Sequence, residues 1–238
     1  MSIPTFSFVL PLRGGSKRVS RKNTRTFAGI DGGLTAIKIS QLIECTEAQK
    51  LYITTDDDEV MEIAAQFNDA RIVIDKRPDY LCSSETKIED LIKYMGNLCE
   101  ADHVFWLHAT APFVGAKTYN KAFDQYLNAL EKGFDSLMSV TKIQQFIWDP
   151  QQRKVINNSS KTSRWPQTQD LAPLYEINHA FYINSRNNYF QQGDRIGLNP
   201  YLFPLSKLEC LDIDWPEDFE MGELLYKACL ELKKPNHE

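Results

Sequence analysis

The chain has 238 residues, 42% of them hydrophobic and 25% charged, which is the composition of a globular protein. A chain of this length can bury a core large enough to fold without disulfides or structural metals. The net charge of −5 argues against a nucleic-acid binder, although a local basic loop can still bind a small anion. The five cysteines are scattered, so we predict neither a zinc site nor disulfides. No apolar run approaches the roughly 18 residues of a membrane span, and the N-terminus shows no signal-peptide pattern, so we predict a cytoplasmic protein without membrane contact.

The first part of the chain alternates short apolar runs with longer amphipathic segments. The expected strands cover residues 6–12, 51–55, 71–74, 103–108 and 136–140. The expected helices cover residues 34–47, 56–67, 85–101 and 117–132. Apolar strands that alternate with helices are typical of a mostly parallel sheet covered on both faces, so we predict an α/β fold of three layers in one domain, 1–238.

A polar stretch, residues 141–178, interrupts this alternation and predicts an inserted lobe or arm. Residues 180–183 return to strand character, and 211–214 form the end of a strand before a last helix that begins at Pro216 with acidic residues behind it. The polar stretch contains an apolar cluster of the kind that suits an interface: Phe146, Ile147 and Trp148.

A basic loop follows the first expected strand. It contains Gly14, Gly15 and Ser16 together with five cations, Arg13, Lys17, Arg18, Arg21 and Lys22. Adjacent glycines let backbone N–H groups approach an anion, and lysine and arginine neutralise its charge. Ligands of open α/β sheets bind beyond the carboxyl ends of the strands, where this loop should lie. The loop matches neither standard glycine-rich phosphate motif, and a solvated basic turn is the alternative interpretation.

A pair of aspartates precedes the last helix. Residues i and i+2 of a strand share a face, so Asp212 and Asp214 would project together and could bind Mg²⁺ with phosphate oxygens and water. The alternative is that Asp214 caps the helix. The segment 106–113 is either a strand exit or part of a site, and the acids within 54–60 either bind metal or, as we favour, open a helix.

Taken in order, these segments resemble the CMP-sialic acid synthetase family, the acylneuraminate cytidylyltransferases, whose relatives include CMP-pseudaminic and CMP-legionaminic acid synthetases. The family pattern R-x-G-S-K-G-x-x-x-K-N corresponds to residues 13–23, and D-I-D-x-P-E-D to 212–218. Its S-T-D-D-E-E-I and L-Q-P-T-S-P segments correspond to 54–60 and 107–112. The resemblance implies a Rossmann-like nucleotidyltransferase fold, a homodimer formed through the inserted arm, and Mg²⁺-dependent transfer of CMP from CTP to an acidic keto-sugar.

The resemblance also implies residue roles. The catalytic residues would be Lys17, Arg13 and Asp214, and the Mg²⁺ ligands Asp212 and Asp214. The nucleotide would be bound by Leu10, Pro11, Arg13, Gly14, Gly15, Ser16, Lys17, Lys22, Asn23, Arg77, His108 and Thr110.

The departures from the family pattern gather in the sugar-facing part. Arg18 and His179 replace glycines, His108 replaces glutamine, and Val114 and Thr168 replace arginines. The arginine that would bind the sugar carboxylate is therefore displaced or absent. The remaining candidates for sugar binding are Lys142, Arg164, Gln169 and Asn178, with Lys161 as a further cation.

Other functions stay open from the sequence alone. A nucleotidyltransferase for octulosonate or a sugar phosphate would share the fold, but the Q-G-D-E-P and G-x-G-T-R segments expected of those enzymes are absent. A metal-dependent glycosyltransferase would explain the D-I-D triplet but not the basic loop. A binding protein of the same ancestry is a further alternative.

Overall fold

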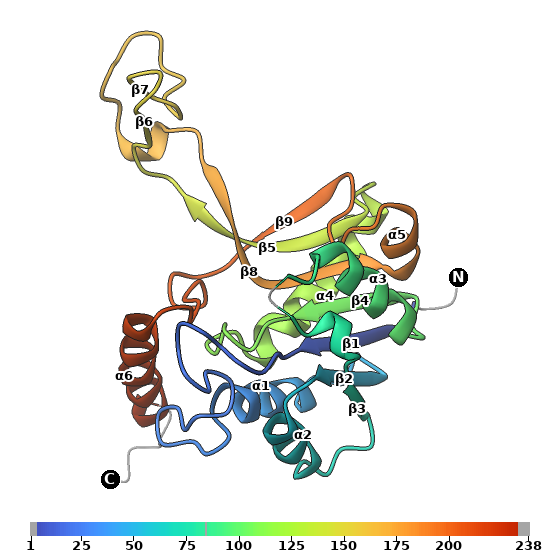
Figure 1. Cartoon of the computed structure of the whole chain (residues 1–238). Helices are drawn as coiled ribbons and strands as arrows, with labels where there is room; N and C mark the ends of the chain where they lie inside the picture. Colours follow the sequence, from blue (N-terminus) through green and yellow to red (C-terminus); the bar gives the residue numbers. More distant parts are fainter. Residues whose placement is uncertain (1–3, 84, 233–238) are drawn as a thin grey trace, which may run out of the picture.

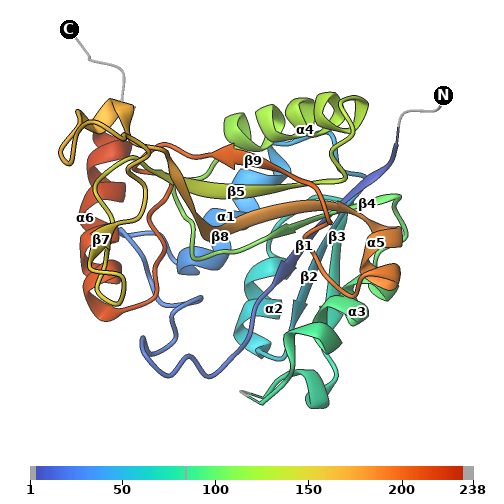
Figure 2. The same cartoon turned by 90° about the horizontal axis from the view of Figure 1, so that it is seen from above.

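The computed structural model describes residues 4–83 and 85–232, and its centre is a seven-stranded sheet with helices on both faces (Figures 1 and 2). The strand order is β3-β2-β1-β4-β8-β5-β9. The strands pair in parallel except where β8 lies antiparallel between β4 and β5. The predicted mostly parallel α/β sheet is therefore confirmed. The sheet strands are β1 (Phe6–Pro11), β2 (Lys50–Thr55), β3 (Ile72–Lys76), β4 (His103–Leu107), β5 (Ser136–Ile143), β8 (Leu174–Ser185) and β9 (Pro200–Pro204).

Alternation along each central strand builds a separate core on each face of the sheet. In β4, Phe105 and Leu107 pack into the larger core, whereas Val104 and Trp106 point to the other face, because successive side chains of a strand alternate. Helices α1, α2, α4 and α6 contribute buried residues to the larger core, and α3 and α5 to the smaller one. The three predicted layers follow from these two cores.

The helices that the sequence predicts begin and end within a few residues of their expected bounds. Helix α5 and strand β9 were not predicted, and two short 3₁₀ turns, Asp79–Leu81 and Thr168–Asp170, were also missed. The expected strand at 211–214 was wrong: these residues are extended loop, and Ile213 donates its N–H to Thr110 O at 2.8 Å. The helices are α1 (Gly33–Ile43), α2 (Asp58–Ala65), α3 (Ile88–Leu98), α4 (Ala116–Glu131), α5 (Arg186–Gln191) and α6 (Pro216–Leu232).

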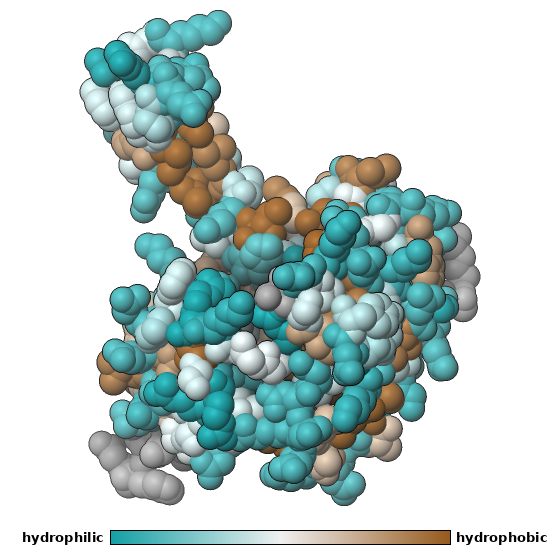
Figure 3. All heavy atoms as spheres, in the orientation of Figure 1, coloured by the Kyte–Doolittle hydropathy of each residue, from teal (hydrophilic) through white to brown (hydrophobic). Residues whose placement is uncertain are grey.

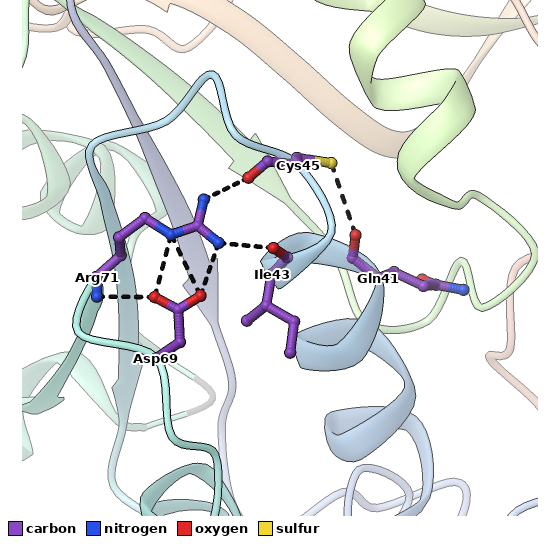
Figure 4. Close-up of polar contacts among 5 residues, drawn as sticks. All are labelled: Gln41, Ile43, Cys45, Asp69 and Arg71. Carbon is purple, nitrogen blue, oxygen red and sulfur yellow. Dashed lines mark hydrogen bonds and ion pairs between the residues drawn. The ribbon is translucent and has the colours of Figure 1, made fainter.

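An arginine just before β3 satisfies the carbonyl groups at the end of α1 (Figure 4). Arg71 donates from Nη2 to Ile43 O at 2.7 Å and from Nη1 to Cys45 O, and Asp69 holds its guanidinium with both carboxylate oxygens. The Cys45 thiol bonds back to Gln41 O at 3.6 Å. The last carbonyls of a helix have no partners within the helix, so this contact fixes α1 against the sheet.

The predicted arm is an extension of two strands of the sheet. Strand β5 runs on to Ile143 and β8 begins at Leu174, and between them lies a small hairpin, β6 (Trp148–Asp149) with β7 (Lys154–Val155). Figures 1 and 3 show this arm projecting away from the body of the molecule. Among the described residues, no helix combines the length and the apolar character needed to cross a membrane.

Candidate active site

The basic loop leaves β1 at the carboxyl edge of the sheet and is fixed at its far end by α1. Thr35 at the start of α1 donates both its N–H and its hydroxyl to Asn23 O, each at 2.9 Å. Gly33 has a φ of 52°, and a Cβ at this position would overlap Arg25 O. Only glycine allows the loop to approach the helix this closely. The loop is therefore a folded element of the structure.

The cations of this loop have different partners. Lys22 donates to Asp214 Oδ1 at 3.0 Å, and Arg18 pairs with the same oxygen at 3.1 Å. Arg21 pairs with Glu59 of α2. Within the described part of the chain, Arg13 and Lys17 form no ion pair. Arg13 and Lys17 therefore remain available to an anion. The basic loop near the N-terminus and the segment before the last helix meet at Asp214.

A cavity of about 560 Å³ lies over the glycine-rich part of the loop. Arg13 and Lys17 line it together with three aspartates. Asp57 caps α2 by accepting from Glu59 N at 3.0 Å, as expected for acids that open a helix. Asp56, which was not singled out, accepts the N–H of Gly14 at 2.9 Å. A nucleotide phosphate that approached this N–H would compete with a carboxylate. The lining residues are Arg13, Gly14, Gly15, Lys17, Asp56, Asp57, Asp58 and Cys82.

A smaller cavity of about 310 Å³ continues from the first toward the C-terminal aspartates. Its lining includes Ser16, Lys17 and Arg18 together with Lys22, the residue that bonds to Asp214. Lys22 and Arg18 therefore link the predicted phosphate-binding loop to Asp214, a predicted metal ligand about 190 residues away in the sequence.

The two predicted metal ligands differ in their surroundings. Burial raises the pKa of Asp212, and the neighbouring Asp214 raises it further, whereas Thr110 and Lys22 act in the opposite direction. The side chain of Asp214 is 38% exposed. Asp214 does not cap the last helix, because Asp218 accepts the N–H groups of Asp214 and Trp215 at 3.0 and 2.7 Å. That leaves the Asp214 carboxylate available to cations.

A divalent cation would fit these residues only with help from a substrate. Among the described residues, no group of three or more His, Cys, Asp or Glu side chains could hold a metal ion. Asp212 and Asp214 supply hard carboxylate oxygens, which suit Mg²⁺, and their mutual repulsion would be relieved by a cation. Substrate oxygens and water would complete the shell of such an ion.

A buried lysine positions the loop that precedes α4. Lys38 of α1 donates to Ala111 O, Val114 O and Tyr119 Oη at 2.8, 3.0 and 2.7 Å. The same loop carries Thr110, whose carbonyl accepts the N–H of Ile213. Sequence reasoning missed Lys38, because a lysine within an amphipathic helix is normally solvent-exposed. Its ammonium group connects α1 to the loop before α4, and Thr110 of that loop in turn bonds the segment that carries the two aspartates.

Another cavity, of about 380 Å³, lies on the face of the sheet covered by α3 and α5. Pro11, His108 and Arg195 line it, with Arg13 shared with the first cavity. His108 Nε2 accepts from Trp106 Nε1 at 3.0 Å, and burial, followed by the charge of Arg195, lowers the pKa of His108 to about 3. This imidazole is therefore a neutral wall of the cavity at physiological pH.

Three predicted nucleotide-binding residues serve the fold through their side chains. Leu10 is fully buried in the larger core, so only its backbone could face a ligand. Arg77 is buried and donates to Thr54 O and Leu12 O at 2.6 and 3.1 Å. Asn23 donates to Arg13 O at 3.2 Å and thereby shapes the loop.

A β-bulge in β8 brings a histidine to the carboxyl edge of β4. The pairing register between β5 and β8 shifts between Met138 and Val140, and His179 takes up a left-handed φ of 57°. Asn178, a predicted sugar ligand, supports the bulge by accepting from Ser139 Oγ at 2.7 Å. Non-glycine residues adopt this conformation at a cost and often occur near functional sites.

The other predicted sugar-binding residues lie on the arm, away from this cleft. Lys142, Arg164 and Gln169 are all exposed, and the Arg164 guanidinium lies over its neighbour Trp165 at 5.8 Å. The structure of one chain does not bring them to the basic loop or to the aspartates. Only residues from the body meet at the cleft.

The chain is similar to known proteins over most of its length. The chain matches the cytidylyltransferase family over residues 7–234. It is 26% identical over 239 residues to the pseudaminic acid cytidylyltransferase of Campylobacter jejuni subsp. jejuni serotype O:23/36 (strain 81-176), with 97% of each chain covered. It is 25% identical over 228 residues to the CMP-N,N'-diacetyllegionaminic acid synthase of Legionella pneumophila subsp. pneumophila (strain Philadelphia 1 / ATCC 33152 / DSM 7513), covering 91% of this chain and 94% of that one. The solved structure of a CMP:2-keto-3-deoxy-manno-octonic acid synthetase complexed with CTP shares the fold, with a TM-score of 0.65 at 14% identity over 94% of this chain and 99% of that one.

Proposed function

Because the chain belongs to the cytidylyltransferase family, we propose that it transfers the CMP part of CTP to a nonulosonic acid of the sialic, legionaminic or pseudaminic type and releases pyrophosphate. The observation that carries this proposal is the meeting of the N-terminal basic loop with Asp214 at one cleft. The five described cysteines are all free thiols, which is compatible with the cytoplasm, a reducing compartment.

The reaction forms a bond between the acceptor hydroxyl oxygen and the α-phosphorus of CTP and breaks the bond from that phosphorus to the bridging oxygen of pyrophosphate. Negative charge increases on the leaving group, so the protein must mainly position the reactants and neutralise charge. We assign this work to Arg13, Lys17 and the backbone N–H group of Gly15, because the N–H of Gly14 is donated to Asp56. The acceptor proton leaves to water or to a nearby acceptor, and no side chain is assigned as its base.

Asp212 and Asp214 are the residues that would hold Mg²⁺, which would orient the α-phosphate and make it more electrophilic. Lys22 and Arg18 already bind Asp214. Their positive charges attract the triphosphate toward the same carboxylate.

Incubation of the full chain with CTP, Mg²⁺ and a panel of sugar acids tests the proposal. We expect pyrophosphate release with pseudaminic, legionaminic or N-acetylneuraminic acid, little release with 3-deoxy-manno-octulosonate, and loss of the activity when EDTA removes the metal. Replacement of CTP by UTP serves as the control. Release with octulosonate alone would assign the chain to that substrate instead, and no release with any of these acids would overturn the proposal.

We further propose that the arm forms a homodimer and delivers its polar side chains to the partner's cleft. Large apolar side chains are exposed along it: Trp165 is 62% exposed, Tyr175 41% and Ile177 39%. Figure 3 shows apolar surface at the base of the arm, on the side that faces the body. Exposed apolar patches of this kind suit an interface.

Size-exclusion chromatography with light scattering tests this dimer. We expect a mass of about twice the 27.4 kDa chain for the unchanged protein at micromolar concentration. Tyr175 and Ile177 lie on one face of β8, so the double variant Tyr175→Asp/Ile177→Asp should be monomeric and nearly inactive. Leu224→Asp, at a 70% exposed position on α6, is the matched control and should leave the dimer intact. A monomeric unchanged protein would contradict the proposal.

A further inference from the structure

Arg195, in the segment between α5 and β9, lines the cavity that contains His108, although it belongs to no sequence motif. The guanidinium of Arg195 lies over the rings of Tyr182 and Trp106, with its central carbon 4.3 and 5.2 Å from their centroids. Figure 2 shows this segment (orange) connecting α5 back to the edge of the sheet. A guanidinium stacked on two aromatic faces has a restricted orientation and keeps its edges, which carry the N–H donors, available.

The charge of Arg195 is not neutralised by the protein. Within the described ranges, 4–83 and 85–232, Arg195 forms no ion pair with a carboxylate. Its guanidinium approaches His179 Nδ1 with Nη2 at the long distance of 3.5 Å. The positive charge of Arg195 contributes to lowering the pKa of both His108 and His179, after burial as the main cause. The cavity wall formed by these residues is therefore electropositive and suits an anion.

The chemistry of the acceptor specifies where a second anion must bind. In the ring form of a 2-keto sugar acid, the hydroxyl that attacks phosphorus and the carboxylate are attached to the same carbon. The carboxylate must therefore lie beside the reacting oxygen and close to the two aspartates. Arg195 contacts His179 at the bulge, and the adjacent Asn178 donates from Nδ2 to Cys210 Sγ at 3.7 Å, which places the segment that leads to Asp212 beside the bulge.

The other cations are less suited to this carboxylate. Lys142 and Arg164 are exposed residues of the arm, which Figure 1 shows projecting away from the body. The Nη2 group of Arg77 is used by Thr54 O and Leu12 O. Arg13 and Lys17 line the cavity assigned to the phosphates. Arg195 is the remaining arginine that lines the cavity containing His108.

We propose that Arg195 binds the carboxylate of the acceptor sugar through a pair of parallel N–H···O bonds, and that it replaces the arm arginine missing at Thr168; this proposal rests on the function proposed above. Fork-to-fork pairing with a carboxylate is the geometry in which arginine exceeds lysine. The bulge at His179 and the ring of Tyr182 then act as positioning residues for the guanidinium.

Kinetics of Arg195→Met and Arg195→Lys test the assignment, with the sugar acid that the panel assay shows to be consumed fastest and with its primary amide. We expect Arg195→Met to lower kcat/KM for the acid by about 10- to 100-fold, mainly through KM, while KM for CTP changes less than about twofold. Unchanged enzyme should prefer the acid strongly over the amide, and Arg195→Met should lose most of that preference. Arg195→Lys should recover part of it.

Arg186→Met is the matched control, because Arg186 also stacks on an aromatic ring, Phe190 at 5.5 Å, but does not line the cavity. Its KM for the sugar acid should stay near that of the unchanged enzyme. If Arg195→Met and Arg195→Lys both keep the KM and the acid-over-amide preference, the assignment is overturned. If the unchanged enzyme fails to consume CTP with any acid, the proposed function itself fails, which is a separate outcome. Thermal melting shows whether Arg195→Met is folded, and if it is not, the lysine variant decides.

Discussion

Asp214→Asn should lower kcat by about 10²–10³ while leaving the fold intact, because removal of one preorganised charge from an active site typically has an effect of that size. Asparagine keeps the shape of the side chain but removes the charge that binds Lys22, Arg18 and, as proposed, Mg²⁺. Asp212→Asn should have a similar effect. The double variant should be only slightly worse than either single one, because groups that act as a unit are not additive.

The measurement is steady-state pyrophosphate release at increasing Mg²⁺ concentration, with circular dichroism to check folding. The melting temperature should change by only a few degrees, since partly exposed ion pairs contribute about 0–1 kcal/mol. Asp31→Asn, an exposed aspartate that bonds Thr26 away from the cleft, is the control and should retain full activity. A folded Asp214→Asn enzyme with a near-normal rate would remove Asp214 from the mechanism.

The body of the fold was predictable because its strands are buried and apolar. The runs around Phe8, Ile53 and Phe105 have few polar residues, and such runs fit only a covered sheet. Strand β9 was missed because Pro200 and Pro204 argue against a strand, and its place at the edge of the sheet tolerates them. The L-D-I-D alternation predicted a strand at 211–214, but these residues bond to the loop after β4 instead of to a neighbouring strand.

The candidate site was predictable where motifs carry it and hidden where tertiary packing builds it. The glycines and cations of the basic loop occur together in sequence, so their shared purpose could be inferred. Lys38, His179 and Arg195 reach the site from α1, a bulge and an irregular connection, and no local pattern marks them. The amide of Asn178 also supports the bulge, and no local pattern marks that contact.

Lys17→Ala should lower kcat/KM for CTP by about 10²–10³, because Lys17 and Arg13 are the loop cations that form no ion pair in the described part of the chain. The loss should be mostly in kcat if the ammonium group stabilises charge that appears on the departing pyrophosphate, and mostly in KM if it binds CTP equally in the ground state. Lys17 is exposed, so its removal should change the free energy of unfolding by no more than about 0.5 kcal/mol.

Two comparisons make this result specific to the phosphate site. Lys50→Ala removes the same kind of exposed side chain at the start of β2, the edge of the sheet opposite the cleft, and should leave the kinetics unchanged. Added salt should weaken CTP binding by the unchanged enzyme more than by Lys17→Ala, because screening reduces only those charge contacts that are still present. If Lys17→Ala and Lys50→Ala were equally active, Lys17 would have no part in catalysis, and Arg13 with the backbone of the loop would have to bind the triphosphate without it.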